Sequence, residues 1–452
     1  MNQQGVRWSS EQVLALAPDD TSRKAGSKLG LPGPWSGAGA DGAGAVWGLC
    51  GGSGGKPYRT VADTAGPAFR CSCPSRKFPC KHALGLLLLW AAEDPSVATG
   101  GAEPEWAAEW LEGRRERAAA RKESAAGGEG GGAPADPEAA VRRAERRAGR
   151  ITAGAAELER RLADLLRGGL ASAEQGGYAL WEETAARMVD AQAPGLAARV
   201  RELGAIPGSG RDWPVRLLEE CALLHLLDTA WLRVERLPEP LAATVRGRVG
   251  LSTSERGAPI RDRWLILAQY DSSDGRVTTR RIWVRGEESG RIALVLSFGA
   301  GGRAPSLSLP VGLVVEADLS PYPGGGGLRA DLGEALGPAV PSAAAPPGGP
   351  VRAAPAAYGR ALAADPWLDA WPVIVSEVIP VPDGSGEGWQ LADAGDGSAL
   401  PVAPAALGRP GLWKLLALSG GDAVTVFGEC GHAGLTPLAA WSAGTAGATA
   451  LV

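Results

Sequence analysis

The sequence predicts an α+β protein of several domains, for three reasons. The chain has 452 residues, more than one hydrophobic core usually holds, so two to four domains are expected. Apolar residues recur with helical spacing from residue 138 to 236, and beyond that they alternate or form short runs between turn residues. Three of the six cysteines and one of the three histidines fall within a dozen positions near the N-terminus, which indicates a small separate unit.

The first unit is expected to contain short helices and strands around this cysteine–histidine stretch. Ser9 and Gln12 have the spacing of a capping box, so a helix should begin there, and a second helix should end at Gly30. Residues 33–45 are rich in glycine and are predicted to be a loop. The predicted strands are 46–50 and 58–64, and a further strand and helix cover 70–90.

The remaining chain divides by composition and periodicity. A charged helix is expected at Pro104–Glu123, and the stretch 242–252 is predicted to open the β-rich part. The predicted boundaries are 1–96 for the cysteine–histidine unit, 97–137 for the charged helix and a Gly/Pro-rich linker, 138–236 for a central helical bundle, 237–336 for a β-rich domain, 337–360 for a Pro/Ala/Gly linker, and 361–445 for a small C-terminal β-rich domain.

Composition and charge limit the classes of function. A formal net charge of −4 argues against a protein that coats nucleic acid over its whole surface, so nucleic-acid binding would need a local basic face. The N-terminus lacks a basic start followed by an apolar run, and the longest apolar run, Ala83–Ala92, is much shorter than the roughly 20 residues that span a bilayer. We therefore expect a soluble cytoplasmic protein with reduced cysteines and no membrane partner.

The cysteine–histidine stretch has the ligand pattern of a structural zinc site. Cys71 and Cys73 form a C-x-C pair, and after six intervening residues Cys80 and His82 form a C-x-H pair. Alternate residues of a strand share a face, and the prolines between the pairs supply a turn, so all four side chains can converge. Three thiolates and one imidazole complete a tetrahedral Zn²⁺ shell. Such a shell has no open position for a substrate, so the metal should stabilise the fold.

Neighbouring residues favour the metal over a disulfide or a redox centre. Four basic residues surround the ligands without an acid between them, and the helix that begins near His82 directs its positive end toward the cluster. A C-x-C pair has poor geometry for a disulfide, and no C-x-x-C motif is present. The basic residues, which are also the candidates for contact with nucleic acid or a partner, are Arg70, Arg76, Lys77 and Lys81.

The motif CSCPSRKFPCKH resembles the C-x-C-x(n)-C-x-H signature of the SWIM zinc finger. The resemblance places the family's four zinc ligands on Cys71, Cys73, Cys80 and His82 and implies a ββα zinc finger unit. The resemblance covers about a fifth of the chain. In this region the sequence is similar to stand-alone bacterial SWIM-domain proteins, which have the finger near the N-terminus. SWIM fingers are held to bind DNA or proteins, and the bacterial proteins are associated with AAA-type ATPases.

Other motifs are weaker, and each has a simpler interpretation. Cys50 fits a buried strand cysteine better than a spare ligand. A second metal site would have to combine two pairs that lie far apart in the sequence. The residues around the first of these pairs are otherwise apolar at helical spacing, which is typical of a buried helix face. The spacing Gly37, Gly39 and Gly42 imitates a dinucleotide-binding motif without its strand and helix and is interpreted as loop. The two distant pairs are Cys221 with His225 and Cys430 with His432.

No catalytic arrangement is found, so we expect a protein that is not an enzyme. Pro57 stands where a P-loop needs Ser or Thr, and two histidines outside the finger support no nucleophilic triad. Two functions stay open. The first is an interaction or scaffold protein in a multiprotein assembly, and the second is a DNA-binding accessory protein that uses the basic face of the finger. An arginine stripe on one helix is more simply a solvated face than a phosphate-binding one: Arg142, Arg143, Arg146, Arg147 and Arg150.

Overall fold

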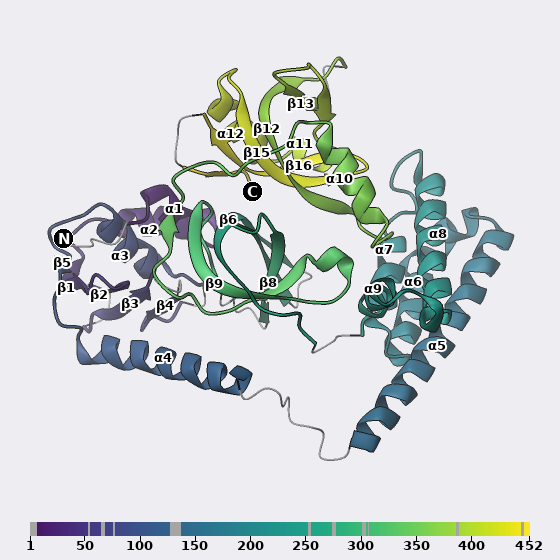
Figure 1. The fold of residues 1–452 in the computed structure, drawn as a ribbon, viewed down its shortest axis with the longest axis horizontal. Helices are drawn as coiled ribbons and strands as arrows, with labels where there is room; N and C mark the ends of the chain where they lie inside the picture. Colours follow the sequence, from purple (N-terminus) through teal and green to yellow (C-terminus); the bar gives the residue numbers. More distant parts are fainter. Residues whose placement is uncertain are drawn as a thin grey trace.

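The structure is a computed structural model, and it combines three β-sheets with a bundle of helices (Figure 1). This confirms the α+β class, with the finger near the N-terminus, the bundle in the middle and strands toward the C-terminus. Among the described residues, none of the helices has both the length and the apolar character needed to cross a membrane. The described residues are 7–52, 55–64, 68–75, 77–126, 137–251, 255–273, 277–300, 304–305, 307–385, 388–443 and 447–452.

The N-terminal unit is a five-stranded sheet with helices on both faces. The strands run in the order β4-β3-β2-β1-β5. Helix α3 covers one face and is buried from His82 to Trp90, while α1 and α2 pack against α3. The predicted capping box of Ser9 and Gln12 is present. The elements are α1 (Ser10–Ala15), α2 (Asp20–Leu29), β1 (Trp35–Ala40), β2 (Ala45–Cys50), β3 (Tyr58–Asp63), β4 (Ala68–Cys71), α3 (Lys81–Ala91) and β5 (Ala98–Thr99).

The prediction of a glycine-rich loop over residues 33–45 is wrong in part, because β1 lies within it and contains Gly37 and Gly39. Strand β1 pairs with β2, and a Cβ atom on Gly39 would lie 2.9 Å from the indole of Trp47. Glycine is needed at position 39 so that this large ring can lie against the neighbouring strand. Composition alone does not separate such close packing from a turn.

Helix α4 (Glu105–Ala126) covers the opposite face of the same sheet, as Figure 1 shows. Ala107 and Leu111 pack against Trp47 and Val61, whereas the alternate strand residue Val46 faces the core under α3. The period-2 alternation of the strands therefore separates two apolar layers. The expected charged helix is present and has one buried edge. The linker expected after it falls at residues 127–136, outside the described residues.

The central bundle is built around a core of buried aliphatic residues and includes one helix that sequence patterning missed. The stretch 242–252 is predicted to begin the β-rich part, but its residues 242–249 belong to α9, where Val245 and Val249 are buried four residues apart. Gly250 ends this helix in a left-handed conformation, with φ of 101°. The elements are α5 (Pro137–Gly168), α6 (Ala171–Asp190), α7 (Pro194–Leu203), α8 (Trp213–Leu232), η1 (Val234–Arg236) and α9 (Glu239–Val249).

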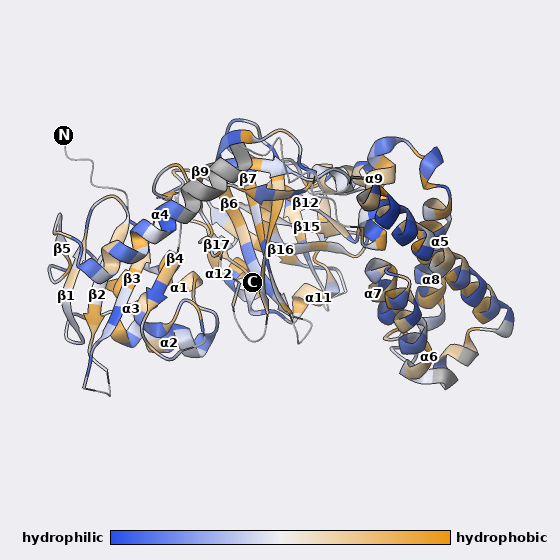
Figure 2. Cartoon of the chain, turned by 90° about the horizontal axis from the view of Figure 1, so that it is seen from below, coloured by the Kyte–Doolittle hydropathy of each residue, from blue (hydrophilic) through white to orange (hydrophobic). Residues whose placement is uncertain are grey.

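Two six-stranded sheets follow the bundle, and they pack on one another through a shared core. Phe427 and Trp441 of the second sheet join Trp283 of the first in one apolar cluster. Glu429 accepts hydrogen bonds from Tyr270 and Trp283, at 2.8 and 2.9 Å. In Figure 2 the hydrophobic colour is concentrated in the strands of these sheets.

The strand orders are β10-β8-β7-β6-β9-β11 and β14-β13-β12-β15-β16-β17. The strands are β6 (Ile260–Ser273), β7 (Val277–Gly286), β8 (Ile292–Ala300), β9 (Leu313–Pro321), β10 (Arg329–Leu332), β11 (Val340–Pro341), β12 (Ala370–Pro382), β13 (Trp389–Asp393), β14 (Ala399–Pro401), β15 (Val424–Gly431), β16 (Gly434–Ser442) and β17 (Thr449–Ala450). The remaining short helices are η2 (Gly325–Gly327), α10 (Ala353–Leu362), α11 (Pro404–Leu407) and α12 (Pro410–Ser419).

The segment 337–360, predicted to be a linker, is instead packed structure. It contains β11 and the start of α10, and Val351 and Ala354 are buried against the second β-rich core. Gly349 exchanges backbone hydrogen bonds with Ile374 and Ser376. Proline, alanine and glycine suit this path because small residues let the segment lie directly against β12. A segment of the same composition that is exposed to solvent forms a flexible linker, so composition alone led to the wrong prediction here.

Candidate metal centre

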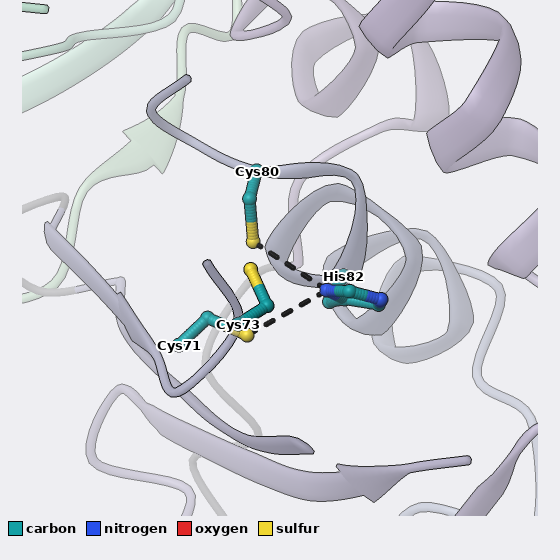
Figure 3. Close-up of side chains that lie close together, drawn as sticks. All are labelled: Cys71, Cys73, Cys80 and His82. Atoms are coloured by element: carbon teal, nitrogen blue, oxygen red, sulfur yellow. Dashed lines mark hydrogen bonds between the residues drawn. The ribbon is translucent and has the colours of Figure 1, made fainter. Parts of the chain in front are cut away.

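Cys71, Cys73, Cys80 and His82 meet at the junction of β4 and α3 (Figure 3). Their ligand atoms all lie within 4.8 Å of one another. Cys71 ends β4, Cys73 lies in the turn after it, Cys80 occupies the N-cap of α3, and His82 is in the first turn of that helix. Within the described part of the chain, this is the one group of three or more His, Cys, Asp or Glu residues with the spacing to hold a metal ion.

The distances fit a tetrahedral ion. The Nδ1 atom of His82 lies 3.7 Å from the sulfur of Cys71 and 3.9 Å from that of Cys80. Tetrahedral Zn²⁺, with bonds of about 2.3 Å to sulfur and 2.0 Å to nitrogen, places such a pair about 3.5 Å apart. The four donors are soft sulfur and imidazole atoms, which is the set that structural zinc takes. Nδ1 is therefore the ligand atom of His82.

Strand pairing positions the first two cysteines and adds a contact that sequence patterning did not reveal. Cys71 lies opposite Thr60 in the ladder between β3 and β4, and the Thr60 hydroxyl is 3.2 Å from the Cys71 sulfur. The backbones of Ser72 and Arg59 continue this ladder past the end of β4. To predict this contact from the sequence, one would need to know the register between β4, which carries Cys71, and its neighbour β3, which carries Thr60. Thr60 is fully buried, and when Cys71 is a thiolate the Thr60 hydroxyl is the donor of this hydrogen bond.

Side-chain packing fixes the orientation of the imidazole. The ring of Tyr58 lies 4.9 Å from the ring of His82, measured between centroids. His82 itself is buried. Tyr58 and His82 come from β3 and α3, so the sheet and the helix hold the ligand from two sides.

The three thiols of the cluster differ in their pKa values. The pKa of Cys71 is lowered to about 3, first because the Cys80 thiol hydrogen-bonds to its sulfur, with further contributions from His82 and Thr60. The pKa of Cys80 is raised because its proton is held by Cys71 and because it is buried. Burial also raises the pKa of Cys73. A metal ion would replace the shared proton and allow all three sulfurs to be thiolates.

One of the described basic residues predicted around the ligands is paired with an acid. Lys77 makes an ion pair with Asp19 of α2, with 2.7 Å between Nζ and Oδ2, and this pairing lowers the pKa of Asp19. Arg70 and Lys81 are exposed. Arg76 lies outside the described residues. The Lys77–Asp19 pair links segments far apart in the sequence, so no local pattern predicted it.

Cys50 is a buried residue of β2, as predicted, and burial raises the pKa of its thiol. Cys221 lies in the core of the bundle, and Cys430 lies in the core of the last β-rich unit. His225 is exposed on α8 and its Nδ1 contacts Glu159 at 2.7 Å. The two pairs named in the sequence therefore belong to different units.

Comparison with protein families gives two matches on this chain. Residues 70–91, from β4 through α3, match the SWIM zinc finger. The chain carries a SWIM zinc finger. Residues 146–249 match the SWIM-associated four-helix bundle domain, a range that includes α9 and ends where that helix ends. Neither a curated protein nor a solved structure matches the chain.

Proposed function

We propose that this protein is a non-enzymatic interaction module in which Zn²⁺ stabilises the N-terminal unit and the helical bundle docks a protein partner. The Cys₃His set supports zinc as the metal, and its closed shell supports a structural role. One observation carries the docking role: α8 exposes several large apolar side chains on its outer face, in addition to those on its core face. Val215, Leu218 and Leu226 are 58, 48 and 44% exposed.

The outer face of α8 is unusual for a surface helix. Leu217, Cys221 and Leu224 face the bundle core. On the opposite side, Val215, Ala222 and Leu226 are exposed along one stripe that is interrupted by Glu219, where a solvated helix would carry mostly polar residues. Apolar residues gathered on one exposed face are typical of a surface that a partner covers. Because stand-alone bacterial SWIM-domain proteins are associated with AAA-type ATPases, such an ATPase is the partner class we propose first.

Capture experiments test the docking role. Tagged wild-type protein should retain a specific partner from lysate of its source, and the double variant Val215→Glu/Leu226→Glu should retain at least tenfold less. Both residues are exposed, so the melting temperature should change little. The matched control is Leu31→Glu/Leu336→Glu, two exposed leucines outside the bundle. Equal capture by both double variants would contradict a docking role for α8.

DNA binding through the finger is the second candidate, and the exposed Arg70 and Lys81 favour it. Lys77 pairs with Asp19, so Arg70 and Lys81 are the described cations of the predicted face that have no acidic partner among the described residues. Two phosphate contacts would lower affinity about tenfold between 50 and 200 mM salt. Retention of duplex DNA that disappears in Arg70→Gln/Lys81→Gln would support this candidate, and binding to the partner should then be unaffected.

A further inference from the structure

A concave surface of about 790 Å³ lies on the bundle between the first part of α5, the end of α8, η1 and α9. The end of α8, η1 and α9 follow one another in the sequence, and the distant helix α5 joins them by packing against α8. The surface is separate from the metal centre, and it includes Arg143 and Arg147 of the arginine stripe that the sequence shows on α5. We call it the arginine groove.

Arginine dominates the charge of this groove. Five arginines line it against two glutamates, Glu145 and Glu235. Two of the five are held by the protein: Arg147 donates to the carbonyl oxygen of Gly250 at 3.2 Å, and Arg246 pairs with Glu239 at 2.8 Å. The other three make no ion pair or side-chain hydrogen bond with any described residue. These three are Arg143, Arg233 and Arg236.

These three arginines are exposed, and unpaired guanidinium groups gathered at a concave surface attract anions. The protein as a whole carries a net charge of −4, so the groove is a local exception and not part of a general basic surface. An anionic partner would therefore be drawn to this place in preference to the rest of the molecule. Carboxylates and phosphates both fit guanidinium groups, so charge alone does not identify the partner.

The floor of the groove separates a protein partner from a nucleic acid. It is lined by apolar side chains, among them Ala148, Leu232 and Leu251, and Leu232 is exposed within it. The aromatic residue there, Trp231, is buried and its indole nitrogen donates to Thr152 at 3.2 Å, so its ring is not free to stack on bases. An apolar floor with a cationic rim complements a peptide that has one apolar and one acidic face.

We propose that the arginine groove binds an acidic amphipathic segment of a protein partner, with apolar side chains on the floor and carboxylates at Arg143, Arg233 and Arg236. The inference rests on the proposed function and deepens it, because it names the chemistry of the segment that the bundle recognises. The apolar outer face of α8 is a separate surface, so the two can be tested independently.

Fluorescence anisotropy with the full-length, zinc-loaded protein tests the proposal. The probe is a labelled helical peptide with glutamates on one face and leucines on the other. We expect Arg233→Glu/Arg236→Glu to weaken its binding about tenfold or more, and added salt to weaken it further. The control Arg211→Glu/Arg360→Glu reverses two exposed arginines outside the groove and changes the net charge equally. It should bind the peptide as the wild type does.

Two variants of the probe identify which features are recognised. Replacing its glutamates by glutamines, or its leucines by serines, should each abolish binding. Equal losses in the two double variants, or tighter binding of single-stranded DNA than of the peptide, would overturn the proposal. A failure here that leaves partner capture through α8 intact would reject the arginine groove alone. Loss of capture in the α8 variant with peptide binding preserved would place recognition in both surfaces.

Discussion

At the scale of single residues, Thr60 shows how the sheet supports the metal ligands. Its buried hydroxyl lies 3.2 Å from the Cys71 sulfur, and the two residues are paired across neighbouring strands. A donor toward a thiolate holds the ligand in place and disperses its charge. The metal site therefore extends beyond the four residues that the motif predicts.

Thr60→Val keeps the shape of the side chain and removes this donor. We expect zinc affinity to fall by about 10- to 100-fold, as is typical when a partner of a metal ligand is lost. Competition with a chromophoric chelator measures the affinity. Thr60→Ser retains the hydroxyl and should stay close to the wild type. Equal affinities in the valine and serine variants would show that the hydrogen bond does not support the metal.

At the scale of elements, α8 carries an uncompensated group inside the bundle. Asp228 is fully buried, and neither of its carboxyl oxygens has a hydrogen-bond partner among the described residues. Burial, with a contribution from the nearby Glu159, raises its pKa to about 9. The folded protein therefore holds Asp228 protonated at neutral pH, whereas the unfolded chain ionises it above its ordinary value of 3.8.

The sign of the pH effect follows from this difference. Between 3.8 and about 9, the unfolded chain binds fewer protons at Asp228, so the contribution of this residue to stability falls as pH rises. Asp228→Asn should remove that slope and stabilise the protein at neutral pH by about 1–3 kcal/mol. Thermal unfolding at pH 5 and pH 8 measures the effect as a difference from the wild type. A gap between wild type and variant that stays constant with pH would contradict the protonated state of Asp228.

How far the sequence predicts this structure depends on whether the deciding contact is local. The C-x-C and C-x-H pairs carry their own geometry, so the sequence placed Cys71 and His82 in one cluster that the structure reproduces. Helix α9 and the packed segment 337–360 were missed because distant surfaces determine them: Val245 packs into the bundle, and Gly349 pairs with β12. The Lys77–Asp19 pair was missed for the same reason.

At the scale of the whole molecule, the N-terminal unit shares its core with the first β-rich sheet. One cluster joins Leu84 and Leu87 of α3 to Trp264 and Leu313. The indole of Trp8 also donates to the carbonyl oxygen of Ala339, at 3.4 Å. The metal centre therefore lies in the same packed unit as strands far along the chain.

Removing zinc should consequently loosen more than the finger. On addition of a chelator, we expect amide hydrogen exchange to rise across β3, β4 and α3, and to a smaller degree across β6 and β9, while the bundle keeps its protection. Cys80→Ser should reproduce this pattern, and Cys50→Ala, which removes a buried thiol outside the ligand set, should not. Unchanged exchange in α3 after metal removal would show that the fold does not depend on the ion.

The hydrogen bonds that Glu429 accepts from the other sheet determine where the chain can be truncated to give a stable fragment. The Glu429 carboxylate holds Tyr270 and Trp283 of the other sheet, beside a layer formed by Phe427 and Trp441. A fragment that starts at residue 361 would leave that carboxylate without donors and would turn two large aromatic side chains outward. Such a fragment should aggregate on expression, whereas a fragment that starts before β6 and contains both sheets should be recovered in the soluble fraction.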